Sequence, residues 1–181
     1  MTQMTTTGRY ISDCQSVAAD PTRERTRRLQ WYPSRSLLAA MRQYQNARGP
    51  LALLSRRIAI ERHRFWSVIT GADIPVNCQI GGGLMLPHPN GVVIAPEAVI
   101  GVNCIIFQQV TIGTASGGYP TLGDDILVGA GAKILGAVKV GTGARIGANA
   151  VVLCDVPPGS TATGVPAKII ALPATGNCAP A

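Results

Sequence analysis

The most regular feature of the chain is an aliphatic residue that returns every six positions from Ile94 to Val152. A gap of ten residues interrupts the series once, and the rhythm then resumes: Ile94, Ile100, Ile106 and Ile112, followed by Leu122, Val128, Ile134, Val140, Ile146 and Val152. The next residue is often glycine, as at Gly101, and the residue two places before is usually small, as at Ala132. A period of six matches neither the 3.6 residues per turn of an α-helix nor the two-residue alternation of an open sheet.

This six-residue period predicts a coil with three short strands per turn, in which each strand turns one aliphatic side chain inward. The small residue fills the tight space beside that side chain, and glycine or asparagine takes the turn backbone that needs a positive φ. The sequence therefore predicts a left-handed parallel β-helix of hexapeptide repeats, which we place at residues 72–172. Aromatic residues make up only 4% of the chain, which agrees with a narrow interior.

A small helical segment is expected before the coil, at residues 31–71, so the fold class is α+β. A first helix would begin after an N-cap, Ser34 or Ser36, and would end at Gly49-Pro50. A second helix fits residues 51–69, with an apolar side and an arginine-rich side opposite it. The apolar residues of the first helix are Leu37, Leu38, Met41 and Tyr44, and those of the second are Leu51, Leu54, Ile58, Phe65 and Ile69. We expect the pair to pack on the first coil or on a neighbouring subunit.

The two ends of the chain lack such periodicity. Residues 1–30 are polar and rich in threonine and arginine, and we predict that they are poorly ordered. Residues 173–181 are predicted to form a flexible tail. No run of about eighteen apolar residues is present, which argues against a transmembrane helix. The first residues lack the basic and then apolar sequence of a secretory signal, so a cytoplasmic location is expected.

Positive charge is concentrated before the coil. Residues 1–70 hold twelve arginines against four acidic residues, whereas the rest of the chain is close to neutral. A basic segment can bind nucleic acid, but no aromatic platform or helix-turn-helix pattern accompanies the charge, so we expect no nucleic acid partner. The simplest interpretation is a solvated helix face, and peripheral contact of the basic helices with an anionic membrane is the alternative.

Cysteine and histidine spacing gives no sign of a metal site. The five cysteines show no C-x-x-C pair and no neighbouring histidines, so we expect neither a zinc site nor a disulfide framework. Cys78 and Cys104 fall on the small inward position of the repeat and are predicted to be buried fillers. His63, among arginines on the second helix, is predicted to be solvated.

Two interruptions of the repeat predict loops that project from the coil. Fourteen residues separate Ile80 from Ile94, two more than a pair of hexapeptides, and the excess falls at residues 87–91. Ten residues separate Ile112 from Leu122, and the excess belongs to the sequence TASGGYPT. Such loops add nothing to the packing of a regular solenoid. Binding and catalytic residues are often found on loops that a rigid scaffold positions.

His88 lies in the first of these loops, between two prolines that stiffen it. A general base that acts on a hydroxyl group at neutral pH needs a neutral imidazole held at a fixed angle, usually by an acidic residue. Asp73 lies fifteen residues earlier, close to the roughly eighteen residues of one coil turn. We predict that Asp73 orients His88, while a local turn role for either residue is the structural alternative.

From Asp73 to about Ala171 the chain resembles the hexapeptide-repeat acyltransferases, and among them the serine acetyltransferase family most. The matching blocks are DIPVNCQIGGGLMLPHPNGVVI, FQQVTIGTASGG, VGAGAKILG, IGANAVV and VPPGSTATGVPAKII. The resemblance implies an acetyl-CoA-dependent O-acetyltransferase of cysteine biosynthesis, with His88 as general base towards the acceptor hydroxyl and Asp73 as the residue that orients it. It implies no metal cofactor.

The same resemblance implies where acetyl-CoA binds. In this family the pantetheine arm lies in a groove between adjacent subunits and contacts main-chain groups. The matching positions here are Gly113, Thr114, Ala130 and Ala148, with Lys168 meeting the CoA phosphates and Arg145 or Lys133 as additional cations. The short helical segment makes a homotrimer the expected assembly, with a hexamer as the alternative.

The acceptor is where the sequence departs from the family. Pro87 replaces an aspartate that usually precedes the histidine. The second loop lacks the usual arginine and histidine after Gly117-Gly118, and Tyr119 follows directly. We expect these three loop residues to contact the acceptor. Serine is the first candidate and a sugar hydroxyl of a polysaccharide the second. A non-catalytic trimeric β-helix scaffold is the alternative from another class.

Overall fold

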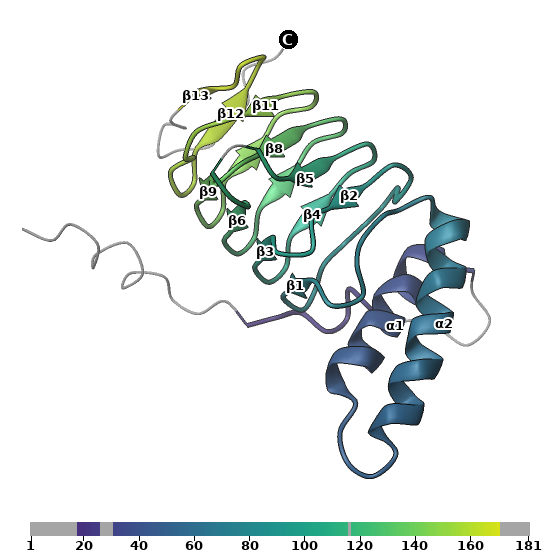
Figure 1. The fold of residues 1–181 in the computed structure, drawn as a ribbon. Coiled ribbons are helices and arrows are strands. Elements are labelled where there is room, and N and C mark those ends of the chain that lie inside the picture. Colours follow the sequence, from purple (N-terminus) through teal and green to yellow (C-terminus); the bar gives the residue numbers. More distant parts are fainter. Residues whose placement is uncertain (1–17, 26–30, 116, 171–181) are drawn as a thin grey trace, which may run out of the picture.

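Within its described residues, the protein has two helices followed by a β-solenoid of stacked coils (Figure 1). The computed structural model describes residues 18–25, 31–115 and 117–170. The predicted β-helix after a small helical segment is confirmed, and its left hand stays a prediction. No helix in the described ranges is long and apolar enough to cross a membrane.

In the described ranges, thirteen short strands form the walls of the solenoid. They are β1 Gln79–Ile80, β2 Val93–Ile94, β3 Val99–Ile100, β4 Ile105–Ile106, β5 Thr111–Gly113, β6 Thr121–Leu122, β7 Leu127–Val128, β8 Lys133–Leu135, β9 Lys139–Val140, β10 Arg145–Ile146, β11 Val151–Val152, β12 Thr161–Thr163 and β13 Lys168–Ile170. Sheet A has the order β11-β8-β5-β2, sheet B the order β1-β3-β6-β9, and sheet C the order β13-β12-β10-β7-β4. The pairing is parallel throughout except between β12 and β13.

The register between coils shows where the two predicted loops were inserted. Leu127 pairs with Arg145, eighteen residues later, which is the regular spacing. Thr111 pairs with Lys133, twenty-two residues later, because the second loop adds four residues between sheets A and B. Gln79 pairs with Val99, twenty residues later, because the first loop adds two between sheets C and A. Both loops therefore leave the coil at its corners, and the walls stay in register.

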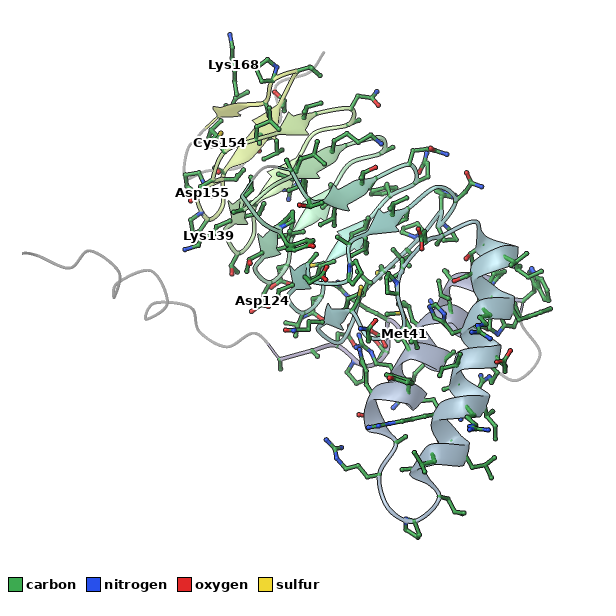
Figure 2. All side chains as sticks on the ribbon, viewed as in Figure 1. Met41, Asp124, Lys139, Cys154, Asp155 and Lys168 are labelled. Carbon is green, nitrogen blue, oxygen red and sulfur yellow. The ribbon has the colours of Figure 1, made fainter. Side chains whose placement is uncertain are left out.

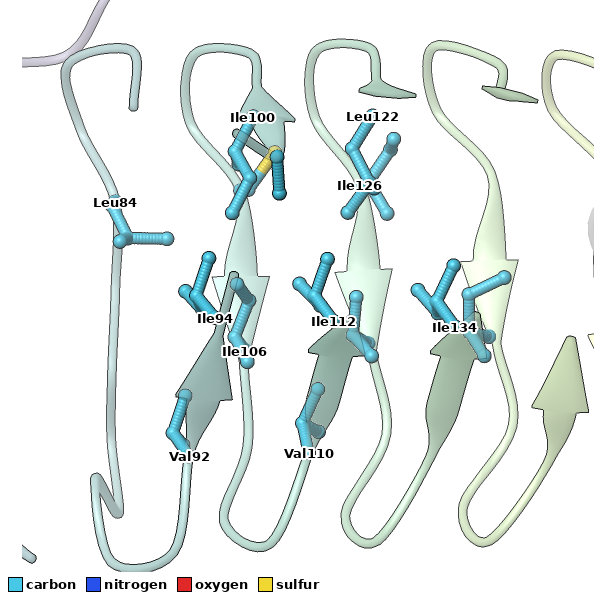
Figure 3. Close-up of a cluster of buried hydrophobic side chains, with 14 of the residues drawn as sticks. Leu84, Val92, Ile94, Ile100, Ile106, Val110, Ile112, Leu122, Ile126 and Ile134 are labelled. Carbon is cyan, nitrogen blue, oxygen red and sulfur yellow. The ribbon is translucent and has the colours of Figure 1, made fainter. Parts of the chain in front are cut away.

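The interior is a column of stacked aliphatic side chains (Figure 3). Every aliphatic residue of the predicted series is at most 2% exposed, and the small residues beside them are buried as well. The inward side chains of neighbouring coils lie above one another because parallel pairing places equivalent residues in register. The six-residue period thus reports the inward residue of the series on each wall of the prism, with a second buried residue two positions before it.

Glycine and asparagine have two separate roles at the corners. Gly129, which directly follows an inward aliphatic residue, does not have a positive φ; a Cβ atom there would lie 2.6 Å from the backbone nitrogen of Ala148 in the next coil. Two residues later the turn does need a left-handed backbone, with φ of 73° at Gly131 and 56° at Asn149. Most glycines that follow an inward aliphatic residue therefore reflect the close approach of coils, whereas a Cβ atom at Gly113 would meet no atom closer than 3.6 Å. The positive φ belongs to a different position of the turn.

Helix α1, Pro33–Asn46, packs against the first coil. Its buried residues Leu37, Leu38 and Met41 join the same hydrophobic cluster as the interior of the solenoid. The helix begins with Pro33 at its first position, after Tyr32 and without a side-chain cap. The predicted serine N-cap is therefore wrong, because both serines lie inside the helix that the fixed φ of proline starts.

Helix α2, Ala52–Thr70, lies antiparallel to α1 and ends at Gly71, whose φ is 64°. Its predicted apolar side is exposed in the single chain; Leu54 and Phe65, for example, are 57% and 56% exposed. The buried residues of the helix are instead Ala59, His63 and Thr70. The prediction that His63 is solvated is therefore wrong. Its exposed fraction is 9%, and its Nε2 atom lies 2.8 Å from the carbonyl oxygen of Ile74.

Residues 18–25 form a strap across the start of the solenoid. The backbone nitrogen of Asp20 donates to the Asn103 side chain (2.8 Å), which in turn donates to the Ala18 carbonyl (3.0 Å). Glu24 accepts from the backbone nitrogen of Leu84 and forms an ion pair with Arg42 (2.9 Å). The rest of the segment predicted to be poorly ordered, and the predicted tail, lie outside the described residues.

Arg42 of α1 completes this end of the coil. Its guanidinium donates to the carbonyl oxygens of Ile80 and Gly81, and Gln45 donates to the Cys78 carbonyl (3.0 Å). Side chains from the helix and the strap thus satisfy four backbone groups at the open edge of the first coil, namely the carbonyls of Cys78, Ile80 and Gly81 and the nitrogen of Leu84.

Shortening one inward side chain tests the importance of the column. We expect Ile112→Ala to lower the free energy of unfolding by about 2–5 kcal/mol, because the rigid walls cannot collapse around the cavity it leaves. Leu153→Ala, at a residue that is 56% exposed, is the matched control and should change it by about 0.5 kcal/mol or less. Equal losses in the two variants, measured by urea denaturation, would contradict a stability based on the interior column.

The buried His63 should make stability depend on pH. Burial lowers the pKa of His63 below its usual 6.5, and its hydrogen bond to Ile74 opposes this only in part. The unfolded chain therefore takes up the proton first, so the free energy of unfolding should fall as pH falls below about 6.5.

The comparison between wild type and His63→Gln at pH 7.5 and 5.5 measures this effect. Glutamine can still donate to Ile74 but has no proton to gain, so its loss of stability should be smaller. The same pH dependence in both would refute the assignment.

Candidate functional site

The first loop lies at the corner where each coil passes from sheet C to sheet A, which we call the His88 corner. It consists of residues 87–92, 107–110, 129–132 and 147–150, and residues 164–167, which connect β12 to β13 of sheet C, form its last level. Backbone hydrogen bonds link each level to the next: Gln109 N to Asn90 O (3.0 Å), Gly131 N to Gln108 O (2.8 Å), Asn149 N to Ala130 O (2.8 Å) and Val151 N to Gly164 O (3.0 Å). The corner is therefore a continuous ridge along the solenoid, and its first level is the loop with His88.

His88 is exposed on a loop that is held from both sides. The backbone nitrogen of Gly91 donates to the carbonyl oxygen of Gly71, at the end of α2 (2.8 Å). On the other side, the Gln109 side chain donates to the Asn90 side chain (3.0 Å). The imidazole is thus presented to solvent from a stiff backbone, as a proton acceptor for an external substrate requires.

Asp73 lies beside this loop, on the edge of sheet A. It forms a parallel bridge with Val93, and its backbone nitrogen donates to the carbonyl oxygen of Val92 (2.8 Å). Val92 is four residues after His88, so the backbone brings the two predicted catalytic residues to the same corner. In the part of the chain that the structure describes, neither the Asp73 carboxylate nor the His88 imidazole makes a hydrogen bond, and both side chains are exposed.

Ala130 and Ala148, two of the residues predicted to contact acetyl-CoA, lie on the His88 corner in consecutive coils. Their small side chains leave the corner backbone accessible, as a groove for a long flexible arm needs. Lys168 is exposed on β13, at the end of the solenoid opposite Met41 of α1 (Figure 2). Lys133 is already engaged, since its ammonium group donates to the Gln109 carbonyl (2.7 Å) and the Thr111 hydroxyl (3.1 Å).

The second loop lies at a different corner, where sheet A passes to sheet B. Gly113 and Thr114 are at its start, and Gly117, Gly118 and Tyr119 follow; Tyr119 is 38% exposed. A cavity of about 380 Å³ adjoins the loop and is lined by residues such as Ala115, Leu135, Leu153, Cys154 and Asp155. The walls of sheet A separate this corner from His88, so one chain does not bring the two predicted groups together.

The buried cysteines are not candidates for nucleophilic chemistry. Cys78 and Cys104 are fully buried, which confirms their predicted role as fillers. Burial is the main cause that raises the pKa of each thiol to about 11. Both thiols therefore remain protonated at neutral pH, and the thiolate is the reactive form.

Sequence reasoning missed Gln109, which supports the His88 loop. It has a left-handed backbone, φ 60°, and a Cβ atom at Gly91 would lie 2.5 Å from its side-chain nitrogen. The neighbouring Gln108 has a buried side-chain oxygen without a partner among the described residues. Alignment of the corner levels would have found Gln109, because it occupies the position of Gly131 and Asn149.

Comparison with known proteins places this geometry in a family. Residues 119–154 match the family described as bacterial transferase hexapeptide (six repeats). A serine acetyltransferase of Helicobacter pylori is 44% identical over 138 residues, which cover 67% of this chain and 81% of that protein.

Two solved structures share the fold. Soybean serine acetyltransferase complexed with serine has a TM-score of 0.63 at 37% identity, over 76% of this chain and 56% of that one. A serine acetyltransferase complex with CoA has a TM-score of 0.65 at 34% identity, over 77% of this chain and 58% of that one. The chain also spans only about half the length of other bacterial relatives that it matches. Its coverage of the shorter relative, together with the shared coil, shows that the chain belongs to the serine acetyltransferase family.

Proposed function

We propose that the protein is an acetyl-CoA-dependent O-acetyltransferase and that serine is its first candidate acceptor. The observation that carries this proposal is the His88 corner, where an exposed imidazole on a stiff loop shares one ridge with Ala130 and Ala148. The relatives are named serine acetyltransferases, and solved structures of the family hold serine or CoA. The non-catalytic scaffold alternative has no comparable support.

The mechanism begins when His88, oriented by Asp73, takes the proton of the acceptor hydroxyl. The oxygen attacks the thioester carbonyl, and the C–O bond forms as the carbonyl becomes a tetrahedral oxyanion. Backbone N–H groups stabilise that oxyanion, and we assign this role to Gly117 and Gly118. The C–S bond then breaks, and the protonated imidazole returns its proton to the CoA sulfur. No covalent enzyme intermediate or metal is needed.

A homotrimer would bring the two corners together. Gly113, Thr114 and the second loop lie at one end of sheet A and His88 at the other, so each site would use the His88 corner of one subunit and the second loop of its neighbour.

We place the reaction in the cytoplasm because acetyl-CoA is available there. Lys168 would meet the phosphates of CoA at the far end of the ridge as a point charge.

A sugar hydroxyl is the second candidate acceptor. Pro87 has no carboxylate for an ammonium group, and the second loop has no cation for a carboxylate next to Tyr119. Thiol release measured with acetyl-CoA against serine, homoserine and a panel of sugars distinguishes the two candidates.

Removal of the proposed base is the first test of the mechanism. We expect His88→Ala to lower kcat by about 10²–10⁴, because general base catalysis contributes that much. The affinity for CoA, measured by calorimetry, should stay close to the wild-type value. His63→Gln provides the control for loss of an imidazole elsewhere. Undiminished thiol release by His88→Ala would refute the mechanism.

Gln109 tests whether the loop must be held in place. Gln109→Asn retains a residue that tolerates a positive φ but is too short to reach Asn90. We expect faster amide exchange at His88 and at residues 90–92, and kcat lower by about tenfold, since misplaced catalytic groups are costly.

The matched control is Asp125→Asn, at a left-handed position of another corner, where φ is 53°. This variant should leave both amide exchange at the His88 loop and kcat unchanged. Unaltered exchange in Gln109→Asn would show that the side chain does not support the loop.

A further inference from the structure

Helix α2 carries a row of apolar side chains that stays exposed in the described chain. The helix contacts the rest of the fold through the buried residues Ala59 and His63 and through Trp66, which packs against the hydrophobic core. The apolar row lies on a different side, because 3.6 residues per turn bring its members into one arc of the helix surface. It consists of Leu51, Leu54, Ile58, Phe65 and Ile69, each 45–70% exposed, and we call it the α2 stripe.

Three exposed leucines gather where the loop between the two helices enters α2, at the end of the hairpin farthest from the solenoid (Figure 1). Leu53 is 76% exposed, and Leu51 and Leu54 of the stripe adjoin it in the chain. Single exposed leucines are ordinary on a protein surface, whereas a contiguous apolar group marks a surface that binds a partner. The α2 stripe is therefore a candidate interaction surface.

Arginines border the stripe on both sides. Arg57 and Arg64 directly precede Ile58 and Phe65 in the chain, which places them about 100° away around the helix, on one border. Arg62 lies on the opposite border, four residues after Ile58. All three arginines are exposed. A long arginine side chain can keep its apolar stem beside such a stripe while its guanidinium remains in a polar layer.

The positive charge of this helix is not balanced within α2. Residues Ala52–Thr70 hold four arginines against one acidic residue, Glu61. Glu61 and Arg64 form an ion pair of 3.0 Å, but both side chains are exposed, so water screens their attraction. Arg57 makes no ion pair with any residue that the structure describes. An apolar centre with positive borders is the pattern of helices that lie on a membrane surface.

A second copy of the chain is the other candidate for covering the stripe. A face-to-face pair would oppose the arginines of one α2 to those of the other, with one Glu61 in each copy against four positive charges. Like charges opposed across an interface are unfavourable. The cytoplasmic leaflet of a membrane is negative because it contains anionic lipids, so its charge complements both borders. Charge complementarity therefore favours a lipid surface.

We propose that α2 lies on the surface of an anionic membrane. The α2 stripe enters the boundary between headgroups and acyl chains, and the arginines on its borders meet the lipid phosphates. The protein is thereby held at the membrane from one side without a spanning segment. This inference adds a location to the proposed function and does not depend on the acetyltransferase activity.

Sedimentation with lipid vesicles tests the proposal on the full chain. One preparation is phosphatidylcholine alone, and the other has equal parts of phosphatidylcholine and phosphatidylglycerol. We expect at least about tenfold tighter binding to the anionic vesicles, because each arginine near such a surface contributes a factor of about five. High salt should remove most of this difference by screening. No binding to the anionic vesicles, or equal binding to both preparations, would overturn the proposal.

Variants assign the binding to α2. Phe65→Ser should weaken binding to the anionic vesicles by about 10- to 100-fold, as expected when one large apolar side chain is no longer buried. Leu153→Ser, at a residue of the solenoid with the same exposed fraction of 56%, is the matched control and should bind normally.

Arg57→Gln tests the positive border and should weaken binding to the anionic vesicles by about fivefold. Lys139→Gln, at an exposed cation of β9, is its control and should leave binding unchanged. Undiminished affinity in both Phe65→Ser and Arg57→Gln would show that α2 is not the membrane surface.

Sedimentation velocity without lipid separates a membrane from a second copy. We expect wild type and Phe65→Ser to have the same mass, because the stripe holds no subunit contact. A smaller mass for Phe65→Ser, with vesicle binding as in wild type, would assign the stripe to a second copy and overturn the proposal. Thiol release from acetyl-CoA, measured without vesicles, should be equal in the two proteins and so tests the acetyltransferase separately.

Discussion

Direct stacking of each coil on the one before it is the constraint on which the rest of the structure depends. Neighbouring strands in a sheet lie only about 4.8 Å apart, so every level must repeat the same outline. A Cβ atom at Gly129 would lie 2.6 Å from the next coil, which shows how little room remains at the corners. The same constraint selects aliphatic residues for the interior, because each wall of a coil buries only two side chains, such as Val110 and Ile112, in a space of fixed width.

This constraint also decides where chemistry can be placed. Extra residues inside a wall would shift the register and turn inward side chains outward. The two insertions are therefore found at corners, where the coil can bulge while Gln79 still pairs with Val99 and Thr111 with Lys133. Insertions that carry function are therefore confined to the corners of such a fold. The His88 corner combines regular levels with one level that holds an inserted loop.

The coil could be predicted from the sequence because its period is set by backbone geometry and repeated many times. Ile94 and its successors, the filler Cys104 and both loops were all predicted on that basis, and the structure bears them out.

His63 could not be predicted, because its burial depends on how α2 lies against Ile74, a contact between segments with different periodicities. The predicted serine N-cap is wrong because Pro33, whose fixed φ suits the first helical position, starts α1 before either serine. Gln109 was missed because its support for the His88 loop appears only when the coils are stacked.

The ends of the solenoid show how the stack is terminated. At the first coil, Arg42 and Glu24 occupy backbone groups that would otherwise pair with another strand, and the strap covers part of the same edge. At the last coil, β13 returns antiparallel on β12, with Thr161 opposite Ile170. An exposed strand edge is a template for addition of further chains. A solenoid of identical coils would expose a pairing edge at each end and could therefore polymerise. These two different caps limit the stack to a fixed number of coils.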